Sequence, residues 1–368
     1  MSLWVLVGNA VMMVVGLILI YLAIAREYEP LLLIPIGFGA LLANMPFAGL
    51  ADPGGVLNFL LVNGIENDLL PALLFVGIGA MCDFSGLIKR PLLLVFAAAG
   101  QLGIFVAVSL ALSLGFSPLE ASSVGIIGAM DGPTAIFVTQ RFAPSLLGPV
   151  TVCAYSYMSL VPLIQVPLSR MLTSREERLI RMEPPQGSVS RTVRVIFPIV
   201  VFLVTGLLAP QGSLLMGALT LGNLMRESCV VGRLTDVAQN ELVSASTLLL
   251  GLAVGGTMKA EAFLNITTIY VLALGLVAFV SSISIGILIA KVANALTGGR
   301  INPLIGACGV SAFPMAARTA HRIGREEDPD NWLLSQALAT NVGGQIASVA
   351  AGGAVLSYAP YVMSLLGL

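Results

Sequence analysis

Charged residues are scarce in this sequence. Asp, Glu, Lys and Arg make up 10% of the 368 residues, whereas hydrophobic residues make up 57%. Ordinary soluble domains carry about 25% charged residues, so most of this chain's surface must face lipid or other apolar helices. The formal net charge of −1 also excludes the basic surface that nucleic-acid binding needs. We therefore expect an all-α polytopic membrane protein that binds no nucleic acid.

Histidine and cysteine are rare as well. The single histidine, His321, lies in a basic segment, where a surface role fits better than proton transfer. The four cysteines are far apart and sit in or beside apolar runs: Cys82, Cys153, Cys229 and Cys308. Their spacing matches neither a metal site nor a disulfide framework, so we interpret them as packing residues.

Long apolar runs are present instead. A run of about 20 apolar residues crosses a bilayer. The candidates lie at roughly 3–23, 30–48, 67–83, 91–114, 146–170, 192–208, 210–226, 242–258, 267–295, 331–350 and 351–367. The first run lacks a basic start and another run follows at once, which favours a retained helix over a cleaved signal. The runs predict about 10–12 transmembrane segments, and two interrupted segments stand apart from them.

The two interrupted segments are centred on Asp131 and Ser311. The first reads Gly125-Ile-Ile-Gly-Ala-Met-Asp-Gly-Pro-Thr-Ala135, and the second runs from Asn302 to Arg318 with two prolines and two glycines. Proline removes a backbone donor and glycine destabilises a helix interior, so each helix should break and free its carbonyl groups. Inside a bilayer, such backbone is tolerated only when protein or a water-filled cavity covers it, and an ionisable residue there indicates function.

The two halves of the chain resemble each other. Four residue pairs recur in the same order, 177 to 180 positions apart: Asn44 with Asn223, Met81 with Met258, Asp131 with Ser311, and Gln165 with Gln345. Paired interruptions at corresponding positions of two halves point to a transport site. If the interrupted segments are re-entrant, the repeats are inverted; if both cross the membrane, the repeats are parallel.

The distribution of Lys and Arg favours the inverted arrangement. These residues prefer short cytoplasmic loops, and with re-entrant segments and an external N-terminus only Arg141 and Lys259 fall on the outer side. We therefore expect two inverted repeats, each with a broken or re-entrant helix. The expected units are 1–172 (first membrane repeat), 173–191 (cytoplasmic linker), 192–350 (second membrane repeat) and 351–368 (C-terminal apolar segment).

Five motifs resemble one known family. They are Gly125-Ile-Ile-Gly-Ala-Met-Asp-Gly-Pro-Thr-Ala-Ile136, Tyr155-Ser-Tyr-Met-Ser-Leu-Val-Pro-Leu-Ile-Gln165, Gly222-Asn-Leu-Met-Arg-Glu-Ser228, Leu250-Gly-Leu-Ala-Val-Gly255 and the segment Asn302 to Arg318. Together, and in this order, they resemble the beta subunit of the biotin-dependent sodium-translocating decarboxylases, which act on oxaloacetate, methylmalonyl-CoA, glutaconyl-CoA or malonate.

The resemblance implies a division of labour. A carboxyltransferase subunit moves a carboxyl group to biotin on a carrier protein, and the beta subunit decarboxylates the carboxybiotin while exporting Na⁺ and consuming a proton. It also implies a small membrane subunit, a homo-oligomer and a place in the inner (cytoplasmic) membrane of a bacterium or archaeon. The chain has no Ala-Met-Lys-Met attachment motif, so the biotin must be on another chain.

The resemblance also implies which residues act. The expected Na⁺ ligands are Asp131, Tyr157, Asn302, Gly306, Ser311 and Asn341. Asp131, Tyr157, Ser311 and Arg318 are expected to take part in the reaction, and Arg318 and Asn341 to bind carboxybiotin. Sodium is a hard cation, which oxygen ligands of these kinds suit.

Structural roles remain open for the same residues. Asp131 could pair with Arg318 merely to join the two segments, and Asn302 and Ser311 could form ordinary interhelical hydrogen bonds. Tyr157 could be an aromatic residue of the membrane interface. A secondary transporter that exchanges Na⁺ for protons, or carries an anion with Na⁺, would have the same repeats and the same buried Asp131. Only the family resemblance separates it from a decarboxylase.

Overall fold

The computed structural model describes residues 3–27, 30–183 and 187–366. Within these ranges the chain consists of helices and their connections, with no β-strand. Six helices are long and apolar enough to cross a membrane, and two pairs of helices, bent by 60° and 63°, raise the number to eight. The predicted all-α, multi-pass fold is thus confirmed. The count is lower than the predicted 10–12 because helices such as the second, with 14 residues, are short.

The helices of the first half run to the polar linker. They are α1 (Leu3–Ala25), α2 (Pro30–Ala43), α3 (Val56–Leu60), η1 (Leu61–Ile65), α4 (Leu69–Met81), α5 (Ser85–Lys89), α6 (Leu92–Gly100), α7 (Gly103–Ser113), α8 (Pro118–Gly125), η2 (Ile126–Ala129), α9 (Gly132–Phe142), η3 (Pro144–Leu146), α10 (Leu147–Ser159) and α11 (Val161–Leu172). The linker itself contains one short helix, α12 (Arg175–Arg178).

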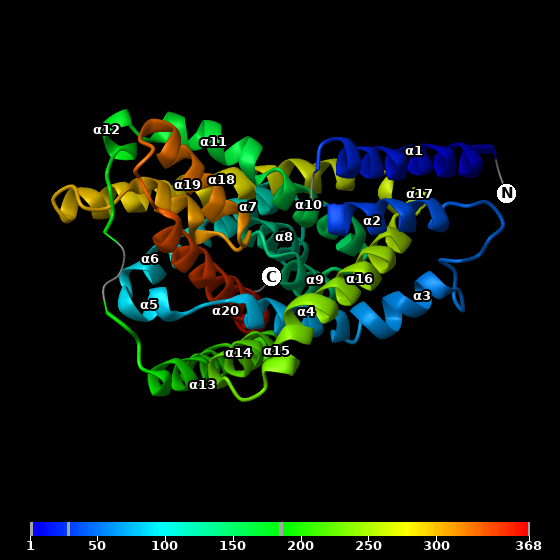
Figure 1. Cartoon of the computed structure of the whole chain (residues 1–368). Helices are drawn as coiled ribbons and strands as arrows, with labels where there is room; N and C mark the ends of the chain where they lie inside the picture. The colour runs from blue at the N-terminus through cyan, green and yellow to red at the C-terminus, as the bar shows by residue number, and fades with distance from the viewer. Residues whose placement is uncertain (1–2, 28–29, 184–186, 367–368) are drawn as a thin grey trace.

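The second half follows a similar order. Its helices are α13 (Arg191–Leu208), η4 (Pro210–Gly212), α14 (Ser213–Ser228), α15 (Gly232–Val237), η5 (Ala238–Leu242), α16 (Val243–Thr257), α17 (Ala260–Phe263), α18 (Ile266–Leu296), η6 (Pro303–Gly309), α19 (Met315–Glu327) and α20 (Leu334–Leu366). Helix α18 has 31 residues, which at 1.5 Å per residue is about 46 Å. It spans the molecule, with α12 near one end and α17 near the other (Figure 1).

Both interrupted segments break where the sequence predicts. In the first, Met130 adopts the left-handed conformation (φ 54°), and Asp131 then caps the N-terminus of α9. In the second, the 3-10 helix η6 begins after its cap Asn302, and α19 starts only at Met315. Proline follows each cap within two residues, where a missing N–H does no harm.

The ends of each interrupted segment lie at one face of the molecule. Before α8, the ring of Phe116 contacts that of Tyr270 (6.3 Å) at the start of α18; after α9, Pro144 lines a cavity with Lys259. In the second segment, Asn302 and the last turn of α19 both bind the linker at the opposite end of α18. Each segment therefore begins and ends at the same end of α18 as a hairpin, the first near the start of that helix and the second near its end.

Among the hydrogen bonds between the halves, four form two matched pairs. The Asn44 side chain donates to the Met258 carbonyl (2.7 Å), and that of Asn223 to the Cys82 carbonyl (2.8 Å). At the breaks, the Gln101 side chain donates to the Gly309 carbonyl (3.1 Å), and the Ser282 hydroxyl donates to the Gly128 carbonyl (2.7 Å). Each half thus holds the other through side chains at corresponding places.

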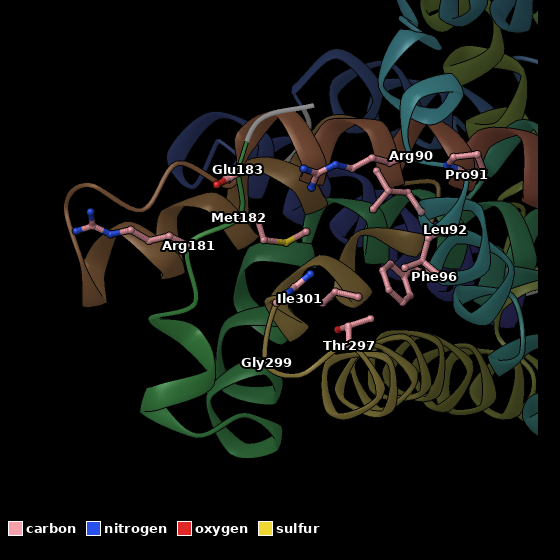
Figure 2. A pocket seen from close by; sticks show the side chains of 12 residues that line it. Arg90, Pro91, Leu92, Phe96, Arg181, Met182, Glu183, Thr297, Gly299 and Ile301 are labelled. Carbon is pink, nitrogen blue, oxygen red and sulfur yellow. The ribbon is translucent and has the colours of Figure 1, made fainter. Parts of the chain in front are cut away.

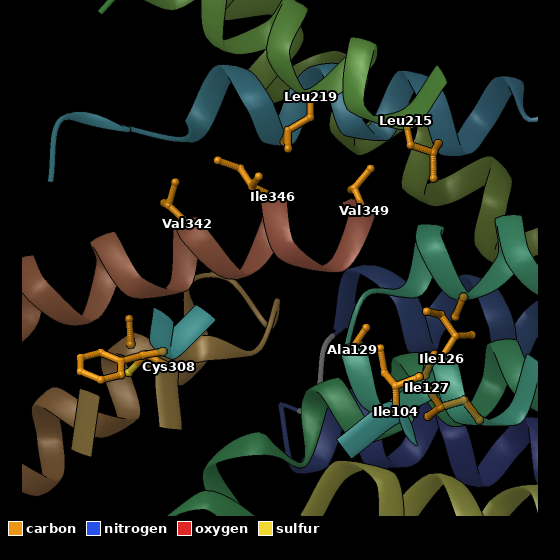
Figure 3. Packing of buried hydrophobic residues seen from close by; sticks show 14 of the residues in the cluster. Ile104, Ile126, Ile127, Ala129, Leu215, Leu219, Cys308, Val342, Ile346 and Val349 are labelled. Carbon is orange, nitrogen blue, oxygen red and sulfur yellow. The ribbon is translucent and has the colours of Figure 1, made fainter. Parts of the chain in front are cut away.

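Close helix packing depends on glycine at the α4–α14 crossing. A Cβ atom on Gly222 would lie 1.9 Å from the Val76 carbonyl oxygen, and one on Gly79 would lie 1.9 Å from the Leu219 carbonyl oxygen. On another side of α14, apolar side chains face those of α20 (Figure 3): Leu215 and Leu219 from α14, and Val342, Ile346 and Val349 from α20. Helix α14 is therefore fixed on two sides.

Replacing Gly222 with alanine is expected to destabilise the protein by about 1–3 kcal/mol, because the backbone of α4 must move to admit the methyl group. The measurement is thermal unfolding of the purified protein in detergent. Gly232→Ala is the control, since a Cβ atom there meets nothing within 4 Å. Equal melting temperatures for the two variants would contradict the packing described for α4 and α14.

Candidate functional site

Asp131 is buried, with only 2% of its surface exposed. One carboxylate oxygen accepts a hydrogen bond from the Thr134 backbone N–H (3.3 Å). The other accepts from the hydroxyl groups of Thr134 (2.9 Å) and Ser348 (2.5 Å). In the described part of the chain, no Lys, Arg or His side chain forms an ion pair with Asp131. The carboxylate is thus held by neutral donors alone.

The tips of the two hairpins touch beside Asp131. The Ser311 backbone N–H donates to the Ala129 carbonyl (3.1 Å), two residues before the carboxylate. The Ser311 hydroxyl donates to the Gly344 carbonyl of α20 (2.7 Å). The structure therefore brings together two of the residues that the sequence pairs, Asp131 and Ser311, and places α20 against both.

A cavity of about 160 Å³ opens between these tips. Its lining combines apolar side chains with a few polar ones, and the polar members are Asp131, Tyr155, Thr247, Ser311 and Gln345. The Tyr155 hydroxyl is buried and has no hydrogen-bond partner among the residues that the structure describes. A water molecule needs only about 15 Å³ of such space, so the cavity has room for a small hydrated ion.

Helix α20 contributes two unpartnered oxygens near the Ser311 hairpin. The Asn341 amide donates to the Val310 carbonyl (2.6 Å), and the Gln345 amide donates to the Ser311 carbonyl. Within the described part of the chain, the side-chain oxygens of both residues are buried without a hydrogen-bond partner. Buried polar atoms are nearly always satisfied in proteins, so these oxygens are candidates for a ligand that the structure does not contain.

Two of the predicted ligands lie elsewhere. Asn302 donates to the Arg178 and Ile180 carbonyls of the linker (3.0 and 2.9 Å) and accepts from the Leu304 N–H (3.0 Å). Its side chain thus fixes the start of η6. Gly306 lies against α18, where a Cβ atom would be 2.1 Å from the Gly286 carbonyl oxygen. Neither residue lines the Asp131 cavity.

Tyr157 and Arg318 are also outside the cavity. The Tyr157 hydroxyl donates to the Leu272 carbonyl of α18 (2.5 Å), and its ring lies 6.2 Å from that of Phe279. Arg318 is exposed on α19, without a side-chain hydrogen bond or ion pair to any described residue, so the Asp131–Arg318 pair is not formed. His321 is half-buried, 5.3 Å from the Trp332 ring.

The sequence analysis missed the roles of Ser348, Thr134 and Tyr155. A signal for Ser348 exists in the spacing of α20: Asn341, Gln345 and Ser348 follow one another at four and three positions, the spacing of one helix face. Gln345 served only as a marker of the repeat. No comparable signal distinguishes Tyr155 from the second tyrosine of its motif.

The linker is docked by ion pairs outside the membrane-spanning segments. Hydrogen bonding from Arg178 (2.8 Å), opposed by desolvation, lowers the pKa of Glu327 below its ordinary 4.5. Hydrogen bonds from Arg181 (2.6 and 2.9 Å), also opposed by desolvation, lower the pKa of Asp328 below its ordinary 3.8. Both carboxyl groups therefore favour the docked linker when they are ionised.

These features define a class. The chain is a multi-pass helical membrane protein whose two interrupted segments meet beside one buried carboxylate. The described residues contain no group of three or more His, Cys, Asp or Glu side chains that could hold a metal ion, so a site at Asp131 would rest on one charge and neutral oxygens. Such a site suits a monovalent cation better than a transition metal.

Comparison with known proteins identifies the family. A family profile described as the Na⁺-transporting oxaloacetate decarboxylase beta subunit matches residues 8–359, and the chain belongs to this family. The resemblance inferred from the five motifs is confirmed. Decarboxylation, sodium transport and a membrane location are accordingly properties of its family.

Curated relatives match nearly the whole chain. The glutaconyl-CoA decarboxylase subunit beta of Acidaminococcus fermentans is 49% identical, covering 95% of this chain and 93% of the relative. The methylmalonyl-CoA decarboxylase subunit beta of Propionigenium modestum is 47% identical, with 95% and 94% covered. The oxaloacetate decarboxylase beta chain 2 of Salmonella typhi is 41% identical, with 95% of each covered.

The linker is expected to stay docked between pH 7 and 5 and to loosen below about pH 4. A carboxyl group whose pKa is lower in the folded state contributes stability above its ordinary pKa, and this contribution is lost as pH falls through the folded-state value. The measurement is hydrogen exchange of residues 174–182 at each pH, corrected for intrinsic exchange rates, which reports how firmly the linker is docked.

A variant separates loosening of the linker from acid denaturation of the whole protein. Glu327→Gln mimics the protonated group and should raise exchange in the linker already at pH 7. Glu326→Gln is the control, because its partner Arg170 is largely exposed and the pair lies at the surface. Unchanged linker exchange in Glu327→Gln would refute the docking role of that carboxylate.

Proposed function

We propose that this chain is the membrane subunit of a sodium-pumping decarboxylase. It removes the carboxyl group from carboxybiotin carried by a partner subunit and couples that step to Na⁺ export, with consumption of a proton. The observation that carries the proposal is the Asp131 carboxylate: it is buried where two hairpin tips touch and has only neutral donors. Family membership supplies the decarboxylase context.

The proposed Na⁺ site is centred on Asp131. A carboxylate near the middle of a bilayer is unfavourable by about 3 kcal/mol, and a bound cation offsets much of that energy. Ser311 and Tyr155 offer hydroxyl oxygens in the same cavity, and Asn341 and Gln345 carry unpartnered amide oxygens. This oxygen set suits a hard cation.

The other predicted residues keep less direct proposed roles. Asn302 and Gly306 shape the hairpin that presents Ser311, through their contacts with the linker and α18. The family motif still favours Tyr157 as an ion or proton partner, although its hydroxyl now donates to the Leu272 carbonyl. Movement of α10 relative to α18 would release that hydroxyl.

The proposed chemistry breaks one bond. The bond between the carboxyl carbon and the ureido nitrogen of biotin is cleaved, CO₂ leaves, and the electron pair stays on the nitrogen, which takes up a proton. Arg318 is exposed on α19, the arm of the second hairpin that reaches the face of the molecule where the linker docks, here called the linker face. Its guanidinium group can hold the departing carboxylate through a bidentate contact. Occupancy of Asp131 by Na⁺ or by a proton would link this step to transport, because both stabilise the same buried carboxylate.

The proposed topology has two inverted repeats. The support is the pattern of matched hydrogen bonds: Gln101 and Ser282 hold the opposite hairpins, and both these residues and their acceptors, Gly309 and Gly128, are 181 positions apart. Hairpins of this kind do not cross the membrane, so an odd number of spans separates corresponding helices of the two halves. The halves then have opposite orientations in the membrane. We place the protein in the inner membrane of a bacterium or archaeon, as a homo-oligomer.

The proposed partners follow from the family context. A carboxyltransferase subunit, a biotin carrier protein and a small membrane subunit complete the proposed assembly. The linker face, with its docked α12 and α19, is the proposed cytoplasmic side, because most of the chain's Arg and Lys residues gather there.

Asp131→Asn is expected to abolish sodium-dependent decarboxylation. The substitution keeps the size of the side chain but removes the charge that holds the ion, so CO₂ release should fall to the sodium-free rate. The measurement is CO₂ release from the carboxylated carrier by the complex, with and without Na⁺. Asp236→Asn, at an exposed position, is the control. Sodium-proton exchange in vesicles without any decarboxylation would favour the secondary transporter instead.

Tyr155→Phe is expected to raise the half-saturating Na⁺ concentration several-fold, because it removes a buried hydroxyl from the cavity and leaves the ring in place. Tyr157→Phe is the matched comparison, in which the hydroxyl lost is one already bonded to Leu272. Sodium titrations of decarboxylation measure both. If only Tyr157→Phe raised the half-saturating Na⁺ concentration, the tyrosine that binds the ion would be Tyr157, as the family motif predicts, and not Tyr155 of the cavity.

A further inference from the structure

A second and larger cavity lies at the linker face. Its volume is about 750 Å³, within the range of small-molecule sites. The α5–α6 turn, the end of the linker and the segment between α18 and η6 form its walls, with Arg90, Leu93, Phe96, Arg181, Met182, Glu183, Thr297, Arg300 and Ile301 among the lining residues. Figure 2 shows Phe96, Met182, Thr297 and Ile301 around the cavity, and Arg181 extending away from it.

The cavity carries an excess of positive charge. Arg181 is neutralised by Asp328 and Asp330 (2.6 and 3.4 Å). Arg90 and Arg300, in contrast, form no side-chain hydrogen bond or ion pair with any residue that the structure describes. Glu183 is the single carboxylate in the lining. Two guanidinium groups without partners at one cavity are a recognition site for an anion, and above all for a carboxylate.

The floor of the cavity is apolar. Leu93, Phe96 and Ile301 are almost fully buried and line the space beneath the arginines. A ligand that fits both parts has a compact, weakly polar ring and a carboxylate. The carboxylated ureido ring of biotin has these features, whereas uncarboxylated biotin lacks the charge at the ring.

The cavity is joined to the Asp131 site through the second hairpin. Ile301 leads directly into Asn302 and η6. At the far end of η6, Gly309 touches α6 so closely that a Cβ atom would lie 2.1 Å from the Phe96 carbonyl oxygen. Two residues beyond Gly309 is Ser311. A ligand resting on Phe96 and Ile301 therefore contacts the elements that hold the hairpin tip.

We propose that Arg90 and Arg300 form the docking site at which the carboxylated ureido ring first binds, before its carboxylate passes to Arg318. The proposal rests on the proposed function, since it names the place where that substrate is received. The arginines are binding residues for the anion, and the apolar floor orients the ring.

Kinetics of CO₂ release test the proposal. The double variant Arg90→Gln/Arg300→Gln should raise the KM for free carboxybiotin by about tenfold or more, because it removes charge-assisted contacts, while kcat changes little. Arg233→Gln, which removes an exposed charge from α15, should leave KM unchanged. The double variant Arg90→Lys/Arg300→Lys keeps the charge, so its KM should lie between those of the wild type and of the Gln double variant. An unchanged KM in the Gln double variant, or a loss of kcat alone, would overturn the proposal.

A labelling experiment separates this inference from the proposed function. Cys229 is the exposed cysteine and the other three are buried, so Thr297→Cys in a Cys229→Ser background reports on the cavity alone. Fresh carboxybiotin should slow its modification by a methanethiosulfonate reagent, and biotin should not. Equal protection by both, or none, refutes the docking site even if sodium-dependent decarboxylation holds. Protection without any CO₂ release leaves the site standing and refutes the decarboxylase.

The alternative ligand for a cavity with this charge is the head group of an anionic lipid. The double variant and its control are therefore also assayed in bilayers of phosphatidylcholine alone, which contain no anionic lipid. A KM effect that persists there supports the carboxylated ring, and an effect that disappears overturns it.

Discussion

The burial of one carboxylate without a cationic partner is the constraint on which this structure depends. Asp131 lies where the backbones of the two hairpins meet, and Thr134 and Ser348 supply only neutral donors. A charge in such a place is unfavourable unless something compensates it. Such a carboxylate favours a bound cation or a proton, and sodium transport is a property of the family.

The surrounding fold keeps that meeting point in place from both sides. Ser282 and Gln101 each hold the hairpin of the other half by its backbone, and the close helix contacts leave little freedom for either half to shift alone. Ile301, the residue just before the second hairpin, lines the linker-face cavity. We propose that the short helix η6 couples binding at that face to ion occupancy at Asp131.

Much of this arrangement is predictable from the sequence, and the exceptions have physical causes. Gly and Pro around Asp131 and Ser311 predict the breaks, because they disfavour helix regardless of tertiary context. The number of spans is harder, since hydropathy does not register a 60° bend between η1 and α4 or a helix of 14 residues. Asn302 looks like a ligand in its motif, but an Asn before Pro is equally typical of a helix cap, and in the structure Asn302 caps η6.

The tyrosines illustrate the limit of motifs for site prediction. Two residues apart on a helix, Tyr155 and Tyr157 point about 200° away from each other, so one lines the cavity and the other faces α18. A motif that contains both cannot choose between them. Ser348, at the far end of the chain from Asp131 in sequence, reaches it only because α20 lies across both hairpin tips.

The most direct test of this account is the location of the bound ion. Cryo-electron microscopy of the assembled complex in NaCl and in choline chloride would compare density in the Asp131 cavity. The account predicts a sodium-dependent peak about 2.3–2.6 Å from Asp131 and from oxygens of Ser311 and α20, as is usual for oxygen ligands of a hard cation. Sodium density at another site, or a cavity closed by an ion pair between Asp131 and a basic side chain, would contradict it.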